Sequence, residues 1–150
     1  MPVLAVCGSE EAAVEARSAG AATLLEPNPS GQNPAARSGV EQALERGAKA
    51  VLLLSSDLPL VTAGALQRVL ERGEEGGPRA VVAAAATGRG GTNALYLRPP
   101  DAIGLHFGDD SLAKFERDAR ERGVDFLVHE SEELALDLDE PTDLDLLGKR

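Results

Sequence analysis

Residues 50–60 read AVLLLSSDLPL, an apolar run followed directly by a polar turn. The run Ala50–Leu54 is apolar on both faces, which is typical of a central strand in a parallel sheet. Pro59 halts that strand and turns the chain. Because ligands of open parallel sheets collect at the carboxyl ends of the strands, the position of Asp57 favours a ligand-binding role. An ordinary turn residue that accepts backbone hydrogen bonds is the alternative.

Outward from this strand, short apolar runs alternate with helical periodicity, and this pattern predicts an α/β fold. The other expected strands are Val3–Cys7, Ala22–Leu25, Ala80–Ala86, Ala94–Leu97, Phe126–His129 and Leu134–Leu138. The expected helices are Glu10–Ala19 capped by Ser9, Ala35–Arg46, one capped by Thr62, one from Asp110 or Ser111 to near Gly123, and one opening at Pro141. Residues 26–34 are too rich in Pro, Gly and Asn for regular structure. We therefore expect one domain over residues 1–150, with a mostly parallel central sheet and helices on both faces.

Composition excludes several classes of protein. The net charge is −10, from 25 acidic and 15 basic residues, so the surface repels nucleic acid but can still accept one small phosphorylated ligand. The single cysteine, Cys7, excludes a disulfide framework and a cysteine-based zinc site. No apolar run approaches the ~20 residues of a membrane span, and the first residues lack the pattern of a signal peptide. The sequence thus predicts a cytoplasmic protein with no membrane partner.

A second candidate position for chemistry is the stretch LDLDEP at residues 136–141. In a strand, alternation places Leu136 and Leu138 on one face, and Asp137 and Asp139 on the other. Two neighbouring carboxylates repel each other unless a cation or a proton joins them, which favours a divalent metal shared with Asp57. Solvated acidic surface is the alternative.

Three glycine-containing stretches are candidates for binding an anion or a base. The glycines of 88–93 let backbone N–H groups approach an anion and Thr92 adds a hydroxyl, although a simple hairpin loop is the alternative. The amides of 107–111 precede a helix and face any anion ahead of it, although capping explains the same residues. In 31–33, the Asn33 amide can read a base edge or belong to a turn.

Four stretches, in this order, resemble the 2-phospho-L-lactate guanylyltransferase family, whose bacterial members use phosphoenolpyruvate. They are SDLPL at 56–60, GGTNAL at 90–95, FGDDS at 107–111 and LDLDEPTDL at 136–144. The resemblance implies a nucleotide-diphospho-sugar transferase fold of the glycosyltransferase-A type. It also implies transfer of GMP from GTP to phosphoenolpyruvate or 2-phospho-L-lactate, with release of pyrophosphate, in coenzyme F-420 biosynthesis.

The resemblance also assigns roles to individual residues. Asp57 and Asp139 resemble the catalytic acids, and the Mg²⁺ ligands implied are Asp57, Asp137 and Asp139. The positions that resemble those holding the three-carbon phosphate substrate are Gly91, Thr92, Gly108 and Ser111. Gly31 and Asn33 resemble the element that borders the guanosine.

The sequence departs from the family at its start. The family begins with an extra strand and a basic segment of the type Ala-Arg-x-Lys-Ser-Arg-Leu, whereas this sequence starts at what resembles the second strand. We therefore expect an N-terminally truncated domain whose sheet lacks the family's first strand. An inactive nucleotide- or partner-binding remnant and an enzyme resembling the molybdenum-cofactor guanylyltransferases are the alternatives. The oligomeric state is open, with a homodimer among the alternatives.

Overall fold

The computed structural model describes residues 3–7, 9–26, 31–55, 57–88 and 90–136. The chain divides into two compact units, residues 1–48 and 49–150, and each is described by itself. That the two form one domain stays a prediction. Within the described ranges, no helix is both long enough and apolar enough to cross a bilayer.

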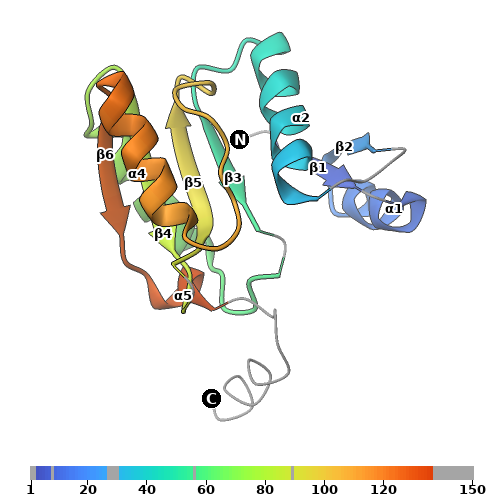
Figure 1. Cartoon of the computed structure of the whole chain (residues 1–150). Coiled ribbons are helices and arrows are strands. Elements are labelled where there is room, and N and C mark those ends of the chain that lie inside the picture. The colour runs from blue at the N-terminus through green and yellow to red at the C-terminus, as the bar shows by residue number, and fades with distance from the viewer. Residues whose placement is uncertain (1–2, 8, 27–30, 56, 89, 137–150) are drawn as a thin grey trace. The chain divides into compact units, whose positions relative to one another are not determined.

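The first unit contains a two-stranded parallel sheet and two helices (Figure 1). Strand β1 (Leu4–Cys7) pairs with β2 (Ala22–Leu25), and the crossover between them is α1 (Glu10–Ser18). The predicted cap of α1 is confirmed, since the Ser9 hydroxyl accepts a hydrogen bond from the Ala12 N–H at 3.2 Å. Helix α2 (Gln32–Glu45) follows β2 in the chain.

Four strands form the sheet of the second unit, in the order β3-β5-β4-β6. Their bounds are β3 (Val51–Leu54), β4 (Ala80–Ala85), β5 (Thr92–Arg98) and β6 (Asp125–His129). Strand β5 is antiparallel to both β3 and β4, whereas β4 and β6 are parallel. The sheet is therefore mixed, and the expectation of a mostly parallel sheet, with Ala50–Leu54 as its central parallel strand, is wrong.

The short connection between β4 and β5 explains the mixed sheet. Residues 86–91 close a hairpin, in which the Ala86 N–H donates to the Gly91 carbonyl at 2.9 Å. A parallel pairing of β4 and β5 would need a crossover of a dozen or more residues, which this loop cannot provide. Reversal of β5 leaves β3, β4 and β6 running in one direction.

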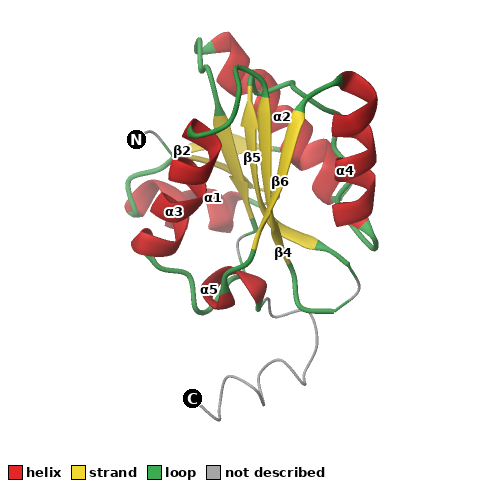
Figure 2. Ribbon diagram, turned by 90° about the vertical axis from the view of Figure 1, so that its left-hand side faces the viewer, coloured by secondary structure: helices red, strands yellow, loops and turns green. Residues whose placement is uncertain are grey.

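Helices cover both faces of this sheet, as predicted (Figure 2). Helix α3 (Ala63–Glu74) packs through Val69 on one face, and α4 (Ser111–Arg122) packs through Phe115 on the other. Side chains of β4 and β5 alternate between these two cores because successive strand residues point to opposite faces. The predicted Thr62 cap of α3 is confirmed by its hydrogen bond from the Ala65 N–H at 3.1 Å.

Two predicted boundaries are wrong. Helix α2 begins at Gln32, inside the expected loop, because Pro34 lies in the first turn, where no N–H has an intrahelical partner. The strand expected over Leu134–Leu138 is not formed by its first residues, which end a helical turn, α5 (Glu132–Ala135). Residues 137–138 and the helix expected at Pro141 lie outside the described residues.

Candidate active site

Those predicted site residues of the second unit that the structure describes lie at one edge of its sheet. Because β3, β4 and β6 share one direction and β5 the opposite one, the carboxyl ends of three strands lie beside the amino end of β5 (Figure 1). Asp57 follows β3, Gly91 precedes β5, and Thr92 is the first residue of β5. This is the edge at which α/β sheets bind ligands.

The glycine hairpin and the start of α4 are joined by hydrogen bonds. The Ser111 hydroxyl donates to Thr92 Oγ1 at 2.9 Å, and both side chains are buried. The Leu112 N–H donates to the Gly90 carbonyl at 3.0 Å. The structure therefore brings Gly91, Thr92 and Ser111 together, although they come from two separate loops.

Left-handed backbone shapes the turn before α4. Gly108 has φ +120°, and Asp110 has φ +58°, the one described non-glycine residue with positive φ. The Ser111 N–H donates to the Gly108 carbonyl at 3.2 Å, which places Gly108 in the same cluster as Ser111. Asp110 holds a conformation that is costly for a residue with a Cβ and that persists only where its surroundings hold it. Asp110 is the residue at the N-cap position of α4, but its side chain makes no capping hydrogen bond, so capping through that side chain does not explain it.

Asp57 lies on a short segment that is anchored on both sides. The Ser55 N–H donates to the Asn93 carbonyl at 3.0 Å, and Leu58 is buried among the residues under α3. The Asp57 side chain is half-buried and makes no hydrogen bond or ion pair with another described residue. Its carboxylate oxygens thus remain available, and carboxylate oxygen is the ligand type that Mg²⁺ prefers.

The other two predicted metal ligands, Asp137 and Asp139, lie outside the described residues. Within the described ranges, no group of three or more His, Cys, Asp and Glu side chains is arranged to hold a metal ion. Of the predicted metal set, the structure therefore describes Asp57 alone. The residue types fit a hard divalent cation, and the set itself stays a prediction.

Gly31 and Asn33 lie in the first unit, at the start of α2. Gly31 is the residue before the helix and has φ +107°, a left-handed region that glycine adopts without strain. Asn33 lies in the first turn of the helix. The turn predicted at this point is thus the helix start itself, and the guanosine-binding role of both residues stays a prediction.

Asn93 is a residue that the sequence reasoning did not single out. Its side-chain amide is buried and donates to the carbonyls of Leu134 and Ala135, at 2.9 and 3.1 Å. The sequence offers one signal, an amide residue directly after Thr92 in an otherwise apolar strand. Its partners lie about 40 residues away in the chain, so local patterns cannot predict them.

Behind the turn at Gly108, an ion-pair cluster fixes the loop that leads into it. Asp118 on α4 accepts hydrogen bonds from His106 Nε2 at 2.7 Å and the Gly104 N–H at 2.9 Å, and Arg122 Nε lies 2.6 Å away. Burial acts to raise the pKa of the Asp118 carboxyl, but these hydrogen bonds and the Arg122 charge bring it below its ordinary value. Asp118 is thus ionised at neutral pH and holds residues 104–106 against α4.

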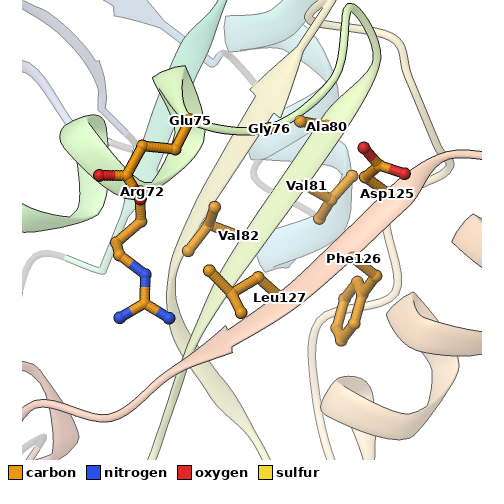
Figure 3. A pocket seen from close by; sticks show the side chains of 9 residues that line it. All are labelled: Arg72, Glu75, Gly76, Ala80, Val81, Val82, Asp125, Phe126 and Leu127. Carbon is orange, nitrogen blue, oxygen red and sulfur yellow. The ribbon is translucent and has the colours of Figure 1, made fainter.

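Two cavities flank the sheet of the second unit. The smaller, of about 230 Å³, lies at the edge of the sheet that carries Asp57 and Thr92, which we call the candidate edge. It is lined by Ala85, Ala86, Glu130, Ser131, Glu132 and Ala135. The larger, of about 410 Å³, lies where β4 and β6 begin, at the opposite edge (Figure 3). Its lining is Arg72, Glu75, Gly76, Ala80, Val81, Val82, Asp125, Phe126 and Leu127, and among the described residues none of the predicted site borders it.

Solved structures define the class of this fold. The chain superposes on a nucleotide-diphospho-sugar transferase from Desulfovibrio desulfuricans with a TM-score of 0.72 at 18% identity, covering 96% of this chain and 63% of that one. It also superposes on CMP:2-keto-3-deoxy-manno-octonic acid synthetase, with a TM-score of 0.68 at 10% identity, covering 98% and 79% of the two chains. The fold is thus that of the nucleotide-diphospho-sugar transferases.

Sequence comparison defines the family within that class. Residues 3–147 match the family "Guanylyl transferase CofC like". A phosphoenolpyruvate guanylyltransferase of Rubrobacter xylanophilus is 42% identical over 142 residues, which are 95% of this chain and 68% of the relative. A 2-phospho-L-lactate guanylyltransferase of Methanothermobacter thermautotrophicus is 38% identical over 94 residues, 63% of this chain and 40% of the relative. The chain belongs to this guanylyltransferase family, and the predicted resemblance is confirmed.

Proposed function

We propose that this chain transfers GMP from GTP to a small three-carbon acid phosphate and releases pyrophosphate, in the biosynthesis of coenzyme F-420. The observation that carries the proposal is the cluster of Gly91, Thr92, Gly108 and Ser111, which we call the glycine cluster. It lies at the edge of the sheet where β3 ends, and Asp57 follows β3 in the chain. Membership of the guanylyl transferase family supports the reaction type. The two units would form one nucleotidyltransferase domain, and the reaction would take place in the cytoplasm.

The acceptor is the point on which related proteins differ. The names of relatives specify phosphoenolpyruvate, 2-phospho-L-lactate or 3-phospho-D-glycerate. Each of these acids carries one phosphate and one carboxylate on three carbons. We assign phosphoenolpyruvate or 2-phospho-L-lactate to this chain as its acceptor. Phosphoenolpyruvate is the acceptor in the name of the relative that is 42% identical over 95% of the chain.

The acceptor phosphate would be bound by the glycine cluster. Thr92 Oγ1 accepts the Ser111 proton, so the proton of the Thr92 hydroxyl remains to be donated to an anion. Backbone N–H groups at Gly91 and Gly108 can approach an anion closely because neither residue has a side chain in the way. Hydrogen bonds to a charged oxygen are about twice as strong as those between neutral groups, so few donors suffice.

The nucleotide would be held by different residues. Gly31 and Asn33 would border the guanosine, with the Asn33 amide reading the base edge. Asp57, Asp137 and Asp139 would hold Mg²⁺, which supplies neutralisation of the crowded phosphate charge and orientation of the reacting oxygens. The ligand set follows from the resemblance and from the available carboxylate of Asp57.

In the reaction, an oxygen of the acceptor phosphate attacks the α-phosphorus of GTP. The bond between the α-phosphorus and the bridging oxygen breaks, and pyrophosphate leaves. The attacking phosphate oxygen is already ionised at pH 7, so no side chain has to remove a proton. The protein's contribution is therefore alignment of the two phosphates and stabilisation of charge, a role that the glycine amides and the Thr92 hydroxyl would share with the bound Mg²⁺.

Replacement of Asp57 tests the proposal. Asp57→Asn keeps the shape of the side chain but removes its charge, and we expect GTP-dependent turnover to fall roughly 100-fold or more. The assay is pyrophosphate release from GTP with each of the three acceptors and with molybdopterin. Asp101→Asn, at an exposed turn after β5, is the matched control and should keep wild-type turnover.

Three results would contradict the proposal. Wild-type turnover in Asp57→Asn would exclude a metal role for that carboxylate. Binding of GTP by the wild-type protein without turnover of any acceptor would favour the nucleotide-binding remnant, and turnover with molybdopterin alone would favour the molybdenum-cofactor alternative.

Sedimentation of the same preparation tests the homodimer, which stays a prediction.

A further inference from the structure

Asn93 lies at the centre of the candidate edge and is almost completely buried, with 3% of its surface exposed. It is the second residue of β5, between Thr92 of the glycine cluster and the apolar core. A buried amide in a strand is costly unless its hydrogen bonds are satisfied, so its partners indicate why it is there.

The side-chain amide of Asn93 holds the end of α5. Its Nδ2 donates to the Leu134 carbonyl at 2.9 Å and to the Ala135 carbonyl at 3.1 Å, so both of its protons have an acceptor. These carbonyls lie at the carboxyl end of a helical turn, where backbone oxygens have no intrahelical donor. The Thr87 N–H adds a third hydrogen bond, to the Ala135 carbonyl at 2.8 Å.

The backbone of Asn93 holds a different segment. Its carbonyl accepts a hydrogen bond from the Ser55 N–H at 3.0 Å, just beyond the last residue of β3. Ser55 precedes Asp57 by two residues, and Ala135 precedes Asp137 by two residues. One residue thus hydrogen-bonds both segments that lead into the proposed metal ligands.

We infer that Asn93 is a positioning residue that holds the segment before Asp57 in fixed register with the end of α5, so that the Asp57 carboxylate is placed to bind a divalent cation. This inference rests on the proposed function. A primary amide is an uncharged side chain that carries two N–H donors. Aspartate would place oxygens against two carbonyl oxygens, alanine would remove both side-chain donors, and serine would supply at most one.

The experiment compares Asn93→Ala with the wild-type protein by two measurements. In metal-free protein, hydrogen exchange of the Leu134 and Ala135 amides should become roughly tenfold faster or more, because two hydrogen bonds that hold the segment are lost. In the presence of GTP, electron paramagnetic resonance of Mn²⁺ should show roughly 10- to 100-fold weaker binding, as is usual when a residue that orients metal ligands is removed.

A matched control separates positioning from general loss of stability. Val81→Ala removes two methyl groups from the core cluster on the other face of the sheet, which contains neither Leu58 nor Leu134. It should lower the melting temperature while Mn²⁺ binding stays within about twofold of wild type. Equal weakening of Mn²⁺ binding by Val81→Ala, at an equal loss of stability, would overturn the inference.

A second variant covers the case in which Asn93→Ala does not fold. Thr87→Pro, at an exposed position, removes the N–H that donates to the Ala135 carbonyl. It should accelerate exchange of the Ala135 amide and weaken Mn²⁺ binding in the same direction. Wild-type exchange and wild-type Mn²⁺ affinity in whichever of the two variants folds would overturn the inference. Failure of the wild-type protein to bind Mn²⁺ with GTP would instead count against the proposed function.

Discussion

The hydrogen bond from Ser111 to Thr92 joins the two loops of the proposed phosphate site, and its removal is the most informative perturbation. Ser111→Ala leaves the buried oxygen of Thr92 without its donor, and such a loss costs about 1–3 kcal/mol. For a chain of this length, that cost lowers the melting temperature by roughly 3–10 °C. The loop at Gly108 would remain attached to Ser111 through the backbone.

A double-mutant cycle isolates the interaction itself. Thr92→Val, Ser111→Ala and the double variant are compared with the wild type by urea denaturation. We expect a coupling free energy of about 0.5–1.5 kcal/mol, since the double variant loses the hydrogen bond only once. Thr92→Ser keeps the hydroxyl and serves as the control. Costs that add to within ~0.3 kcal/mol would refute the link between the two loops.

Two further predictions concern the framework around the site. Gly73→Ala should destabilise the protein by about 1–3 kcal/mol in urea denaturation, because a Cβ there would overlap the Tyr96 ring; an unchanged midpoint would contradict this close packing of α3 on β5. Burial, with the charges of Arg72 and Arg68, lowers the pKa of His129 below its ordinary 6.5, although Glu133 acts to raise it. The unfolded chain therefore takes up this proton first, so the free energy of unfolding should fall as the pH drops below about 6.5, and His129→Leu should flatten that dependence.

Local sequence signals predicted helices and strands correctly where the formation of the element depends on residues that are neighbours in the chain. Ser9 and Thr62 cap their helices through the hydrogen bonds that their positions indicate. Helical periodicity also located α4, in which Phe115 is fully buried. In each case, the stabilising contact lies within one or two helical turns, or on one face that periodicity defines.

The errors arose where distant partners or short connections decide the structure. The apolar run Ala50–Leu54 reads as a central parallel strand, but its hydrogen-bonding partner is the reversed strand β5. The brevity of loop 86–91 was the signal that the sheet is mixed. At Leu134, alternation predicted a strand, whereas Ser131 and the acidic residues after it begin the helical turn.

The proposed site was predicted in part for the same reasons. Gly91, Thr92, Gly108 and Ser111 lie in two recognisable glycine-containing loops, and the resemblance to a known family indicated that these loops act together. The sequence did not predict the role of Asn93 because its hydrogen-bond partners, the carbonyls of residues 134–135, lie far along the chain. No local pattern distinguishes a buried amide with such partners from a polar residue at the start of a strand.

The most direct test of guanylyl transfer at this edge is a nuclear magnetic resonance titration of the wild-type protein with GTP and a small amount of Mn²⁺. Paramagnetic broadening should be strongest for the amides of Asp57, Thr92 and Ser111. The amides of Gly76 and Asp125, at the opposite edge of the same sheet, should stay sharp. Broadening centred on Gly76 and Asp125, with the signal of Asp57 unaffected, would contradict the account.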